Sequence, residues 1–194
     1  MIDHGTYGVV EKAIDKKNGN IVAIKNLKDE GNKETFQIEE SVMAAIDHPN
    51  VLNCLGYYYI NKSKRILLVT PFCSKGNLQS LLQKLTDKTE KFKVKICLEL
   101  ARGLNALHEK NLMHRDMKPA NILFDDQWTA KICDFGFSKV DDDLSKSVKV
   151  GTPIYRDPNI DGGKYSKKCD IYSLGLIFDT IFRGYSPFRG MKDH

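Results

Sequence analysis

The spacing of hydrophobic residues in the first third of the chain is that of strands with a single helix. The β-branched runs at 9–14 and 21–25 flank the turn signal Lys17-Asn18-Gly19-Asn20 and predict a hairpin. Apolar residues from Phe36 to Ile46 then recur at helical spacing and stop before Pro49, so one helix is expected there. Two more strands are expected around a polar turn at 61–64, over residues 51–60 and 66–69.

The pattern after Pro71 is mainly helical. A leucine stripe predicts a helix over 78–85 with Asn77 as its N-cap, and apolar residues predict a longer helix from Phe92 to Leu107. Short strands are expected at 122–124 and 131–133, and a strongly apolar helix at 171–182 ends near Gly184. Residues 134–159 show little periodicity, and a loop that long in a compact domain is usually functional. These elements predict an α+β fold, with a small sheet lobe to residue 70 and a mainly helical lobe from 71 to 194.

The composition is that of a folded globular domain. The 194 residues are 41% hydrophobic and 28% charged, and the net charge is +5. The basic residues are spread along the chain, so nucleic acid is not an expected partner. Neither a leader-like start nor an apolar run of about 18 residues is present in the sequence, so a membrane partner is not expected. Five widely spaced cysteines without a C-x-x-C pair favour a reducing compartment, the cytoplasm, with the nucleus left open.

Two acids and an amide lie next to the short strands of the second lobe. Asp116 and Asn121 come before the strand at 122–124, and Asp134 follows the strand at 131–133. Carboxylate and amide oxygens can hold a divalent metal and leave one carboxylate free to accept a proton.

The first lobe offers groups that suit a phosphate. Gly5 and Gly8 flank a hairpin turn, where missing side chains let backbone N–H groups approach an anion. Lys25 ends a buried strand and needs an anion there, and Glu39 on the following helix can hold it in place.

These residues belong to a set of motifs that resembles the catalytic domain of eukaryotic-type protein kinases. The motifs follow the order and spacing of that family over nearly the whole chain, which makes the set far more specific than one glycine-rich fragment. They are Gly5-x-x-Gly8-x-Val10, Val22-Ala23-Ile24-Lys25, His114-Arg115-Asp116 with Asn121, Asp134-Phe135-Gly136, Gly151-Thr152-Pro153-x-Tyr155 and Asp170-Ile171-Tyr172-Ser173-Leu174-Gly175. The resemblance implies a bilobal kinase-like fold over 1–194, with an incomplete first strand and without the last helices of the helical lobe.

The resemblance also implies a reaction: transfer of a phosphoryl group from ATP, with Mg²⁺, to Ser/Thr hydroxyls of protein substrates. Lys25 would bind the α- and β-phosphates and pair with Glu39, which lies ten residues before Pro49 and is preferred to Glu40 for that reason. Gly5 and Gly8 would approach the phosphates.

Four polar residues of the second lobe would complete the reaction centre. Asp116 would orient the substrate hydroxyl and take its proton, with Lys118 as a second catalytic residue. Asn121 and Asp134 would ligate magnesium.

The adenine base would occupy an apolar pocket between the lobes. Thr70 would guard its back, and the backbone of Pro71 and Cys73 would contact the adenine edge. Three apolar residues would sandwich the ring: Val10, Ala23 and Leu123. Cys133 beside this pocket is expected to be a buried, inert thiol rather than a reactive one.

The resemblance favours serine and threonine as acceptors, because Lys118 and Thr152 are typical of that class. Arg115 and Lys139 indicate a basic pocket for a phosphorylated residue, with Ser147 best placed and Ser145 second.

Three departures from the family pattern favour an alternative reading. Asp3 stands at the position of the first loop glycine, and Asp157-Pro158-Asn159 replaces Ala-Pro-Glu. With the last helices absent, the apolar residues of the helix at 171–182 are expected to form an exposed patch that a partner would cover; they are Leu174, Leu176, Ile177, Phe178, Ile181 and Phe182. The alternative function is that of a pseudokinase or interaction module, which binds nucleotide or a partner without useful turnover.

Overall fold

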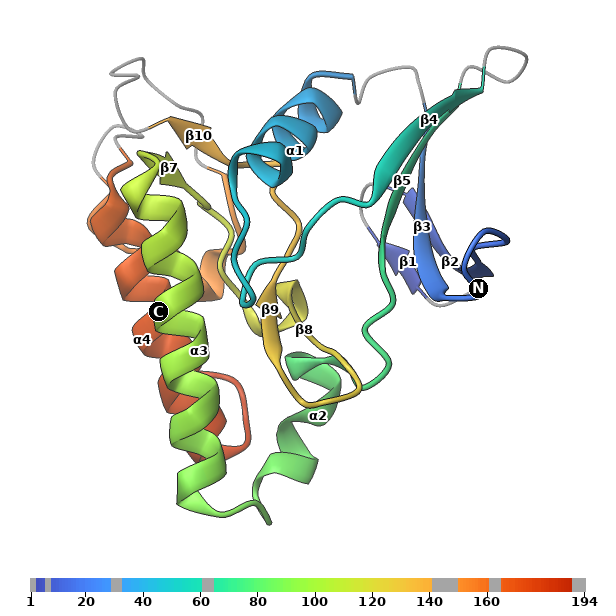
Figure 1. Cartoon of the computed structure of the whole chain (residues 1–194). Helices are drawn as coiled ribbons and strands as arrows, with labels where there is room; N and C mark the ends of the chain where they lie inside the picture. Colours follow the sequence, from blue (N-terminus) through green and yellow to red (C-terminus); the bar gives the residue numbers. More distant parts are fainter. Residues whose placement is uncertain are drawn as a thin grey trace.

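The computed structural model describes residues 3–5, 8–28, 33–60, 65–140, 150–160 and 165–189. Figure 1 shows a sheet with one helix on one side of the molecule and a mainly helical part on the other. The α+β architecture expected from the hydrophobic pattern is therefore confirmed.

The sheet has five antiparallel strands in the order β1-β2-β3-β5-β4. They are β1 (Asp3–Gly5), β2 (Gly8–Ile14), β3 (Ile21–Lys28), β5 (Arg65–Pro71) and β4 (Gly56–Ile60). Gly5 of β1 pairs with Gly8 of β2, so the two glycines lie together at the end of the first hairpin, as expected. In the second hairpin Gly19, at φ +75°, takes the left-handed conformation that its turn requires. Helix α1 (Lys33–Ala45) lies beside this sheet (Figure 1).

The strand expected at 51–60 is shorter than its apolar sequence indicates, because β4 begins at Gly56. Residues 50–52 pair with another strand of the molecule instead: Leu52 N–H donates to Ile132 O at 2.8 Å, and Ile132 N–H donates to Asn50 O at 2.9 Å. Gly103 packs closely against this contact, since a Cβ at position 103 would stand only 2.6 Å from Asn50 O. The apolar character of 51–52 thus reflects burial against the helical part, where Val51 and Leu52 are 2% and 5% exposed.

Long helices and short strands make up the second part. Helix α2 (Leu78–Leu85) has the expected N-cap, since Asn77 Oδ1 accepts a hydrogen bond from Ser80 N–H at 2.8 Å. Helix α3 (Glu90–Glu109) buries one apolar stripe completely, with Ile96, Leu100 and Leu107 at 0% exposure. The remaining elements are β6 (Gly76–Asn77), β7 (Leu112–Met113), η2 (Pro119–Asn121), β8 (Ile122–Phe124), β9 (Ala130–Ile132), β10 (Lys139–Val140), η3 (Pro153–Tyr155) and α4 (Lys167–Arg183).

The expectation that the helix at 171–182 exposes its whole apolar set is wrong. Helix α4 packs against α3, and Leu174, Ile177 and Ile181 are at most 6% exposed because their spacing places them on one helix face. Leu176 and Phe178 are partly buried, and only Phe182 of the six is exposed, at 45%. α4 ends at Gly184, whose φ of +79° is a left-handed C-cap, so the predicted end is confirmed.

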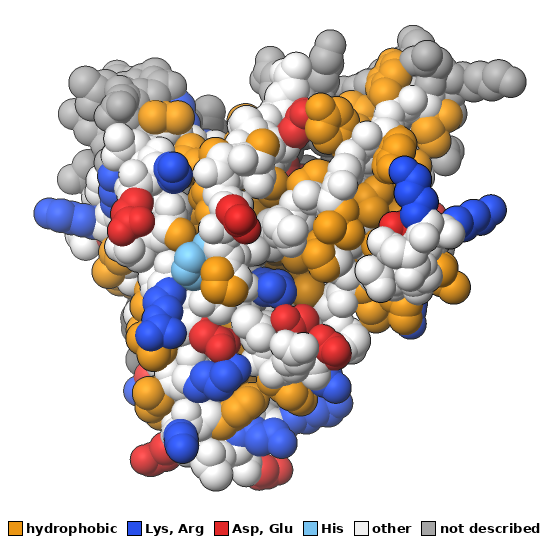
Figure 2. Space-filling model, viewed as in Figure 1, with side chains coloured by type: hydrophobic (Ala, Val, Ile, Leu, Met, Phe, Trp, Pro, Cys, Tyr) orange, Lys and Arg blue, Asp and Glu red, His pale blue; other side chains and the backbone are white. Residues whose placement is uncertain are grey.

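Surface chemistry differs between the two parts. Figure 2 shows hydrophobic side chains gathered over β4 and β5, whereas Lys and Arg side chains lie among Asp and Glu over the helical part. The exposed apolar residues of β4 include Tyr57, Tyr58 and Tyr59, at 54% to 61% exposure. Within the described ranges, none of the helices combines the length and apolarity that a membrane crossing requires.

Candidate active site

Lys25 connects the sheet to the helical part of the molecule. It lies in the middle of the sheet on β3, paired with Val10 on β2 and Leu68 on β5. Its Nζ donates to Glu39 Oε2 at 2.8 Å and Oε1 at 2.9 Å, and to Asp134 Oδ1 at 3.0 Å. The structure therefore brings together three of the predicted site residues, from β3, α1 and the segment after β9.

The burial of this cluster sets its charge state. Burial alone would lower the pKa of Lys25, but the carboxylates of Glu39 and Asp134 outweigh it and raise that pKa well above its ordinary value. Burial raises the pKa of Glu39, and the Lys25 ammonium opposes this rise. Lys25 is thus held as a fixed, partly buried cation. The neighbouring Glu40 contacts Tyr57 instead, and their hydrogen bond raises the pKa of Tyr57.

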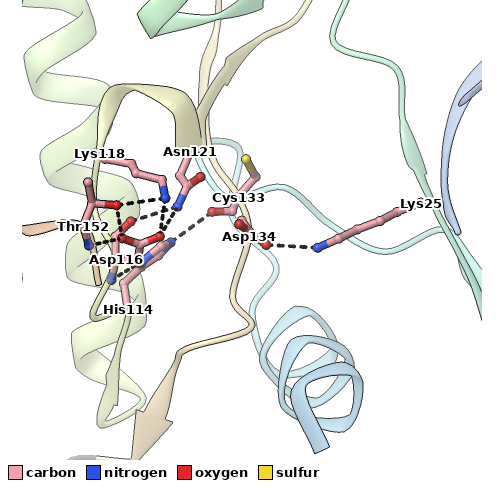
Figure 3. Close-up of polar contacts among 8 residues, drawn as sticks. All are labelled: Lys25, His114, Asp116, Lys118, Asn121, Cys133, Asp134 and Thr152. Atoms are coloured by element: carbon pink, nitrogen blue, oxygen red, sulfur yellow. Dashed lines mark hydrogen bonds and ion pairs between the residues drawn. The ribbon is translucent and has the colours of Figure 1, made fainter. Parts of the chain in front are cut away.

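Asp116 is the centre of a second polar cluster, shown in Figure 3. Its Oδ2 accepts from Lys118 Nζ at 2.6 Å and from Asn121 Nδ2 at 3.1 Å. Its Oδ1 accepts from both the backbone N–H and the hydroxyl of Thr152, at 2.8 and 2.9 Å. Four donors thus fix the orientation of a carboxylate that is 4% exposed.

Gly151 lets the segment with Thr152 reach Asp116. Its φ is +88°, and a Cβ at this position would stand 2.5 Å from Arg115 O. Only a residue without a side chain allows the two backbones to come this close. The sequence marked Gly151 as part of a motif and Thr152 also as typical of serine and threonine acceptors, but it did not predict the contact of Thr152 with Asp116.

Two buried residues hold the backbone beside Asp116. Asp170 on α4, 1% exposed, accepts from His114 N–H at 2.9 Å and from Arg115 N–H at 2.8 Å. The ring of His114 accepts a hydrogen bond from Asp116 N–H through Nδ1 at 3.2 Å. The ring proton is therefore on Nε2, which donates to Cys133 O at 3.0 Å. His114 is therefore a structural link between the backbones at 116 and 133. In the sequence, Asp170 is recognisable only as the first residue of a motif, without a role of its own.

Asp134 lies between Lys25 and the cluster around Asp116 (Figure 3). Its φ of +66° is uncommon for a residue with a side chain. Phe135, which follows it, is fully buried and packs edge-on against His114 with ring centroids 5.4 Å apart. Cys133 N–H donates to Asn121 O at 3.0 Å, which ties the backbone before Asp134 to Asn121.

The donor set is of the kind that a magnesium ion prefers. Asn121 turns its amide nitrogen toward Asp116 and its oxygen away from Asp116 (Figure 3), and Asp134 adds a carboxylate that is 25% exposed. Hard oxygen donors supplied by one carboxylate and one amide suit Mg²⁺, which keeps several waters and takes further oxygens from phosphate. Among the described residues, no three His, Cys, Asp or Glu side chains are grouped as metal ligands.

The residues expected around adenine come from four elements. Val10 lies on β2, Ala23 on β3 and Leu123 on β8, and all three are partly exposed. Thr70 pairs with Ala23 across β5 and β3 and is 8% exposed. In the segment after β5, Cys73 O accepts a hydrogen bond from Gly76 N–H at 3.3 Å. Burial raises the pKa of the Cys73 thiol to about 11 and that of Cys133 well above 9.0.

Some of the residues predicted from the sequence lie outside the part of the chain that the structure describes. Ser145 and Ser147 are not among the described residues, and the side chain of Asp3 is not described. Arg115 Nε donates to Phe137 O at 2.6 Å, and Lys139 lies on β10, paired with Met113 of β7.

Comparison with known sequences identifies the family. The chain belongs to the protein kinase domain family, whose model matches residues 1–194. It is 39% identical, over 97% of its own length and 34% of the relative's, to calcium-dependent protein kinase 5 of Plasmodium berghei (strain Anka). It is 35% identical to serine/threonine-protein kinase RUNKEL of Arabidopsis thaliana, over 96% of its own length and 14% of the relative's. It is 36% identical to serine/threonine-protein kinase dst1 of Dictyostelium discoideum, over 94% of its own length and 25% of the relative's. The chain thus spans about a third or less of the length of these relatives.

Proposed function

We propose that the chain transfers the γ-phosphoryl group of ATP, with Mg²⁺, to serine and threonine hydroxyls of protein substrates. The observation that carries this proposal is the position of Lys25 Nζ, which lies within 3.0 Å of both Glu39 and Asp134. A partly buried cation fixed between a sheet and a candidate metal ligand is well positioned to bind the charged phosphates of a nucleotide.

The two polar clusters have separate roles in this proposal. Lys25 and Asp134 hold the nucleotide, and Asn121 joins Asp134 in holding Mg²⁺, which neutralises phosphate charge when bound. Asp116 accepts the proton of the substrate hydroxyl. Lys118, 2.6 Å from Asp116, adds a positive charge next to the group that is transferred. Catalysis is then mainly positioning and electrostatic stabilisation.

The adenine base occupies the space between Val10, Ala23 and Leu123, with Thr70 at its back. Pro71 lacks an N–H group, so it contacts the base through its carbonyl, and Cys73 contributes backbone groups. The relatives named serine/threonine kinases support hydroxyl acceptors of that type.

The test is transfer of labelled γ-phosphate from ATP to a generic basic protein. The full chain is compared with Asp134→Asn and Asp116→Asn, which keep the shape of each side chain and remove its charge. We expect transfer by the wild type that a metal chelator abolishes, and a loss of at least about a hundredfold in both variants. Equal counts from all three proteins would assign the signal to a contaminant.

A second measurement separates the proposed kinase from a pseudokinase. A ligand that binds only the folded state raises the melting temperature, so MgATP is added in a thermal unfolding experiment. A shift without transfer would replace the proposal by nucleotide binding alone. The absence of both would remove the nucleotide from the function.

A further inference from the structure

Tyr165 makes a contact that the proposed reaction does not explain. It lies two residues before α4, and its hydroxyl accepts a hydrogen bond from Val150 N–H at 2.7 Å and donates one to Val150 O at 2.7 Å. One side-chain oxygen therefore satisfies both backbone groups of the same residue, as a neighbouring strand would.

Val150 begins the short segment that carries Thr152 to Asp116. Gly151 packs its backbone against Arg115 O, and Thr152 then makes its two hydrogen bonds to Asp116 Oδ1, at 2.8 and 2.9 Å. Val150 is partly buried and lies outside any helix or strand. The two hydrogen bonds to Tyr165 hold the backbone of Val150 and so fix the start of this segment.

The ring of Tyr165 packs against Arg115, the residue directly before Asp116. The guanidinium of Arg115 stands 5.4 Å from the ring centroid, and Arg115 Nε is held by Phe137 O at 2.6 Å. Arg115 N–H in turn donates to Asp170 on α4 at 2.8 Å. Tyr165 thus lies just before α4, the helix whose Asp170 anchors the backbone that precedes Asp116.

We propose that Tyr165 is a positioning residue for phosphoryl transfer, and this rests on the function proposed above. Its hydroxyl holds Val150 so that Thr152 keeps the Asp116 carboxylate in its reactive orientation. Tyr165 acts only through Val150 and Thr152, so its loss lowers turnover without changing how the nucleotide is bound.

The first test is Tyr165→Phe in the full chain, which keeps the ring over Arg115 and removes the hydroxyl. We expect kcat to fall about tenfold while the KM for ATP stays within about twofold. The matched control is Tyr58→Phe on β4, where the side chain is 61% exposed, and its kcat is expected to equal that of the wild type. An unchanged kcat in Tyr165→Phe, or a parallel change in kcat and KM, would overturn the proposal.

A double-mutant cycle with Thr152→Ala shows whether the effect passes through Thr152. The alanine removes the hydroxyl bond to Asp116, so the additional loss caused by Tyr165→Phe is expected to be clearly smaller in this background than in the wild type. Additive losses would contradict the proposed route. A wild type without any phosphoryl transfer would refute the proposed function itself. An active wild type whose kcat is unchanged by Tyr165→Phe would refute only the role of Tyr165.

A measurement on the wild type covers the case in which Tyr165→Phe does not fold. The bond to Tyr165 predicts that the Val150 amide hydrogen exchanges at least about tenfold more slowly than in an unstructured peptide. Exchange at the peptide rate in the folded chain would show that the hydroxyl does not hold Val150, and would overturn the proposal.

Discussion

Lys25 and Asp134 are 109 residues apart in the sequence, and their side chains meet at 3.0 Å. Lys25 comes from the middle of a sheet and Asp134 from a loop with a left-handed backbone, so the contact joins the two parts of the molecule. Glu39 holds the same ammonium from α1. Three charges of a buried cluster therefore depend on the mutual placement of the sheet, one helix and the segment after β9.

Lys25→Met is expected to make the stability of the fold depend more steeply on pH. Burial already raises the pKa of Glu39 above 4.5, and the variant lacks the ammonium group that mainly opposes that rise. The folded variant then keeps a proton that the unfolded chain releases. The contribution of Glu39 to the free energy of unfolding is therefore largest below pH 4.5 and is lost as the pH rises through the raised folded pKa. Urea unfolding across this range measures the slope.

The control for this prediction is the double variant Lys25→Met with Glu39→Gln, which lacks the Glu39 carboxyl group. Its profile is expected to lack the fall in stability that Glu39 causes in the single variant. At neutral pH the single variant is expected to lose about 3 kcal/mol, the usual cost of leaving a buried charge without its partner. A single variant whose profile parallels the wild type would contradict the assignment of the slope to Glu39.

Gly151→Ala and Gly175→Ala are expected to change stability in opposite directions. A Cβ at Gly151 meets Arg115 O at 2.5 Å in a left-handed backbone, which predicts a loss of about 2 kcal/mol and of phosphoryl transfer. A Cβ at Gly175, inside α4, meets nothing within 4 Å, so the alanine there is expected to gain about 0.5 kcal/mol. Chemical unfolding of both variants is the measurement, and similar effects at the two sites would contradict the close approach at Gly151.

Asp170→Asn is expected to weaken the support of the backbone before Asp116. The carboxylate accepts from two backbone N–H groups, and an amide at this position presents an N–H group to one of them. We expect a loss of about 2 kcal/mol in the free energy of unfolding. Asp179→Asn on the same helix is the control, because Asp179 is 40% exposed and pairs with the exposed Arg183. The control should stay within about 0.5 kcal/mol of the wild type, and equal losses would argue against the role of Asp170.

Cys133 is expected to react slowly although it adjoins Asp134. Burial raises the pKa of its thiol well above 9.0, so the reactive thiolate is scarce at neutral pH. Alkylation by iodoacetamide, followed by mass spectrometry, should be at least about tenfold slower in the folded chain than in urea. Raising the pH should increase the rate. Fast labelling of Cys133 in the folded chain would show that the site is open to the reagent.

Local patterns predicted most elements because each depends on neighbours in the sequence. The leucine stripe and Asn77 gave α2 with its cap, and Gly184 gave the end of α4. The two-residue strands were missed, since β7 and β10 exist only through their pairing with each other. The apolar residues 51–55 read as a strand, but Leu52 bonds to Ile132 of β9 rather than to the main sheet.

The sequence by itself determined which chemical groups the chain carries, their order, and the periods of its helices and strands, because those properties are local. Only the tertiary structure decided which groups meet. It confirmed the predicted contact of Glu39 with Lys25, turned one face of α4 into the core, and brought Tyr165 to Val150. Such contacts depend on the packing of whole elements against each other, and periodicity within any one element carries no information about its partner.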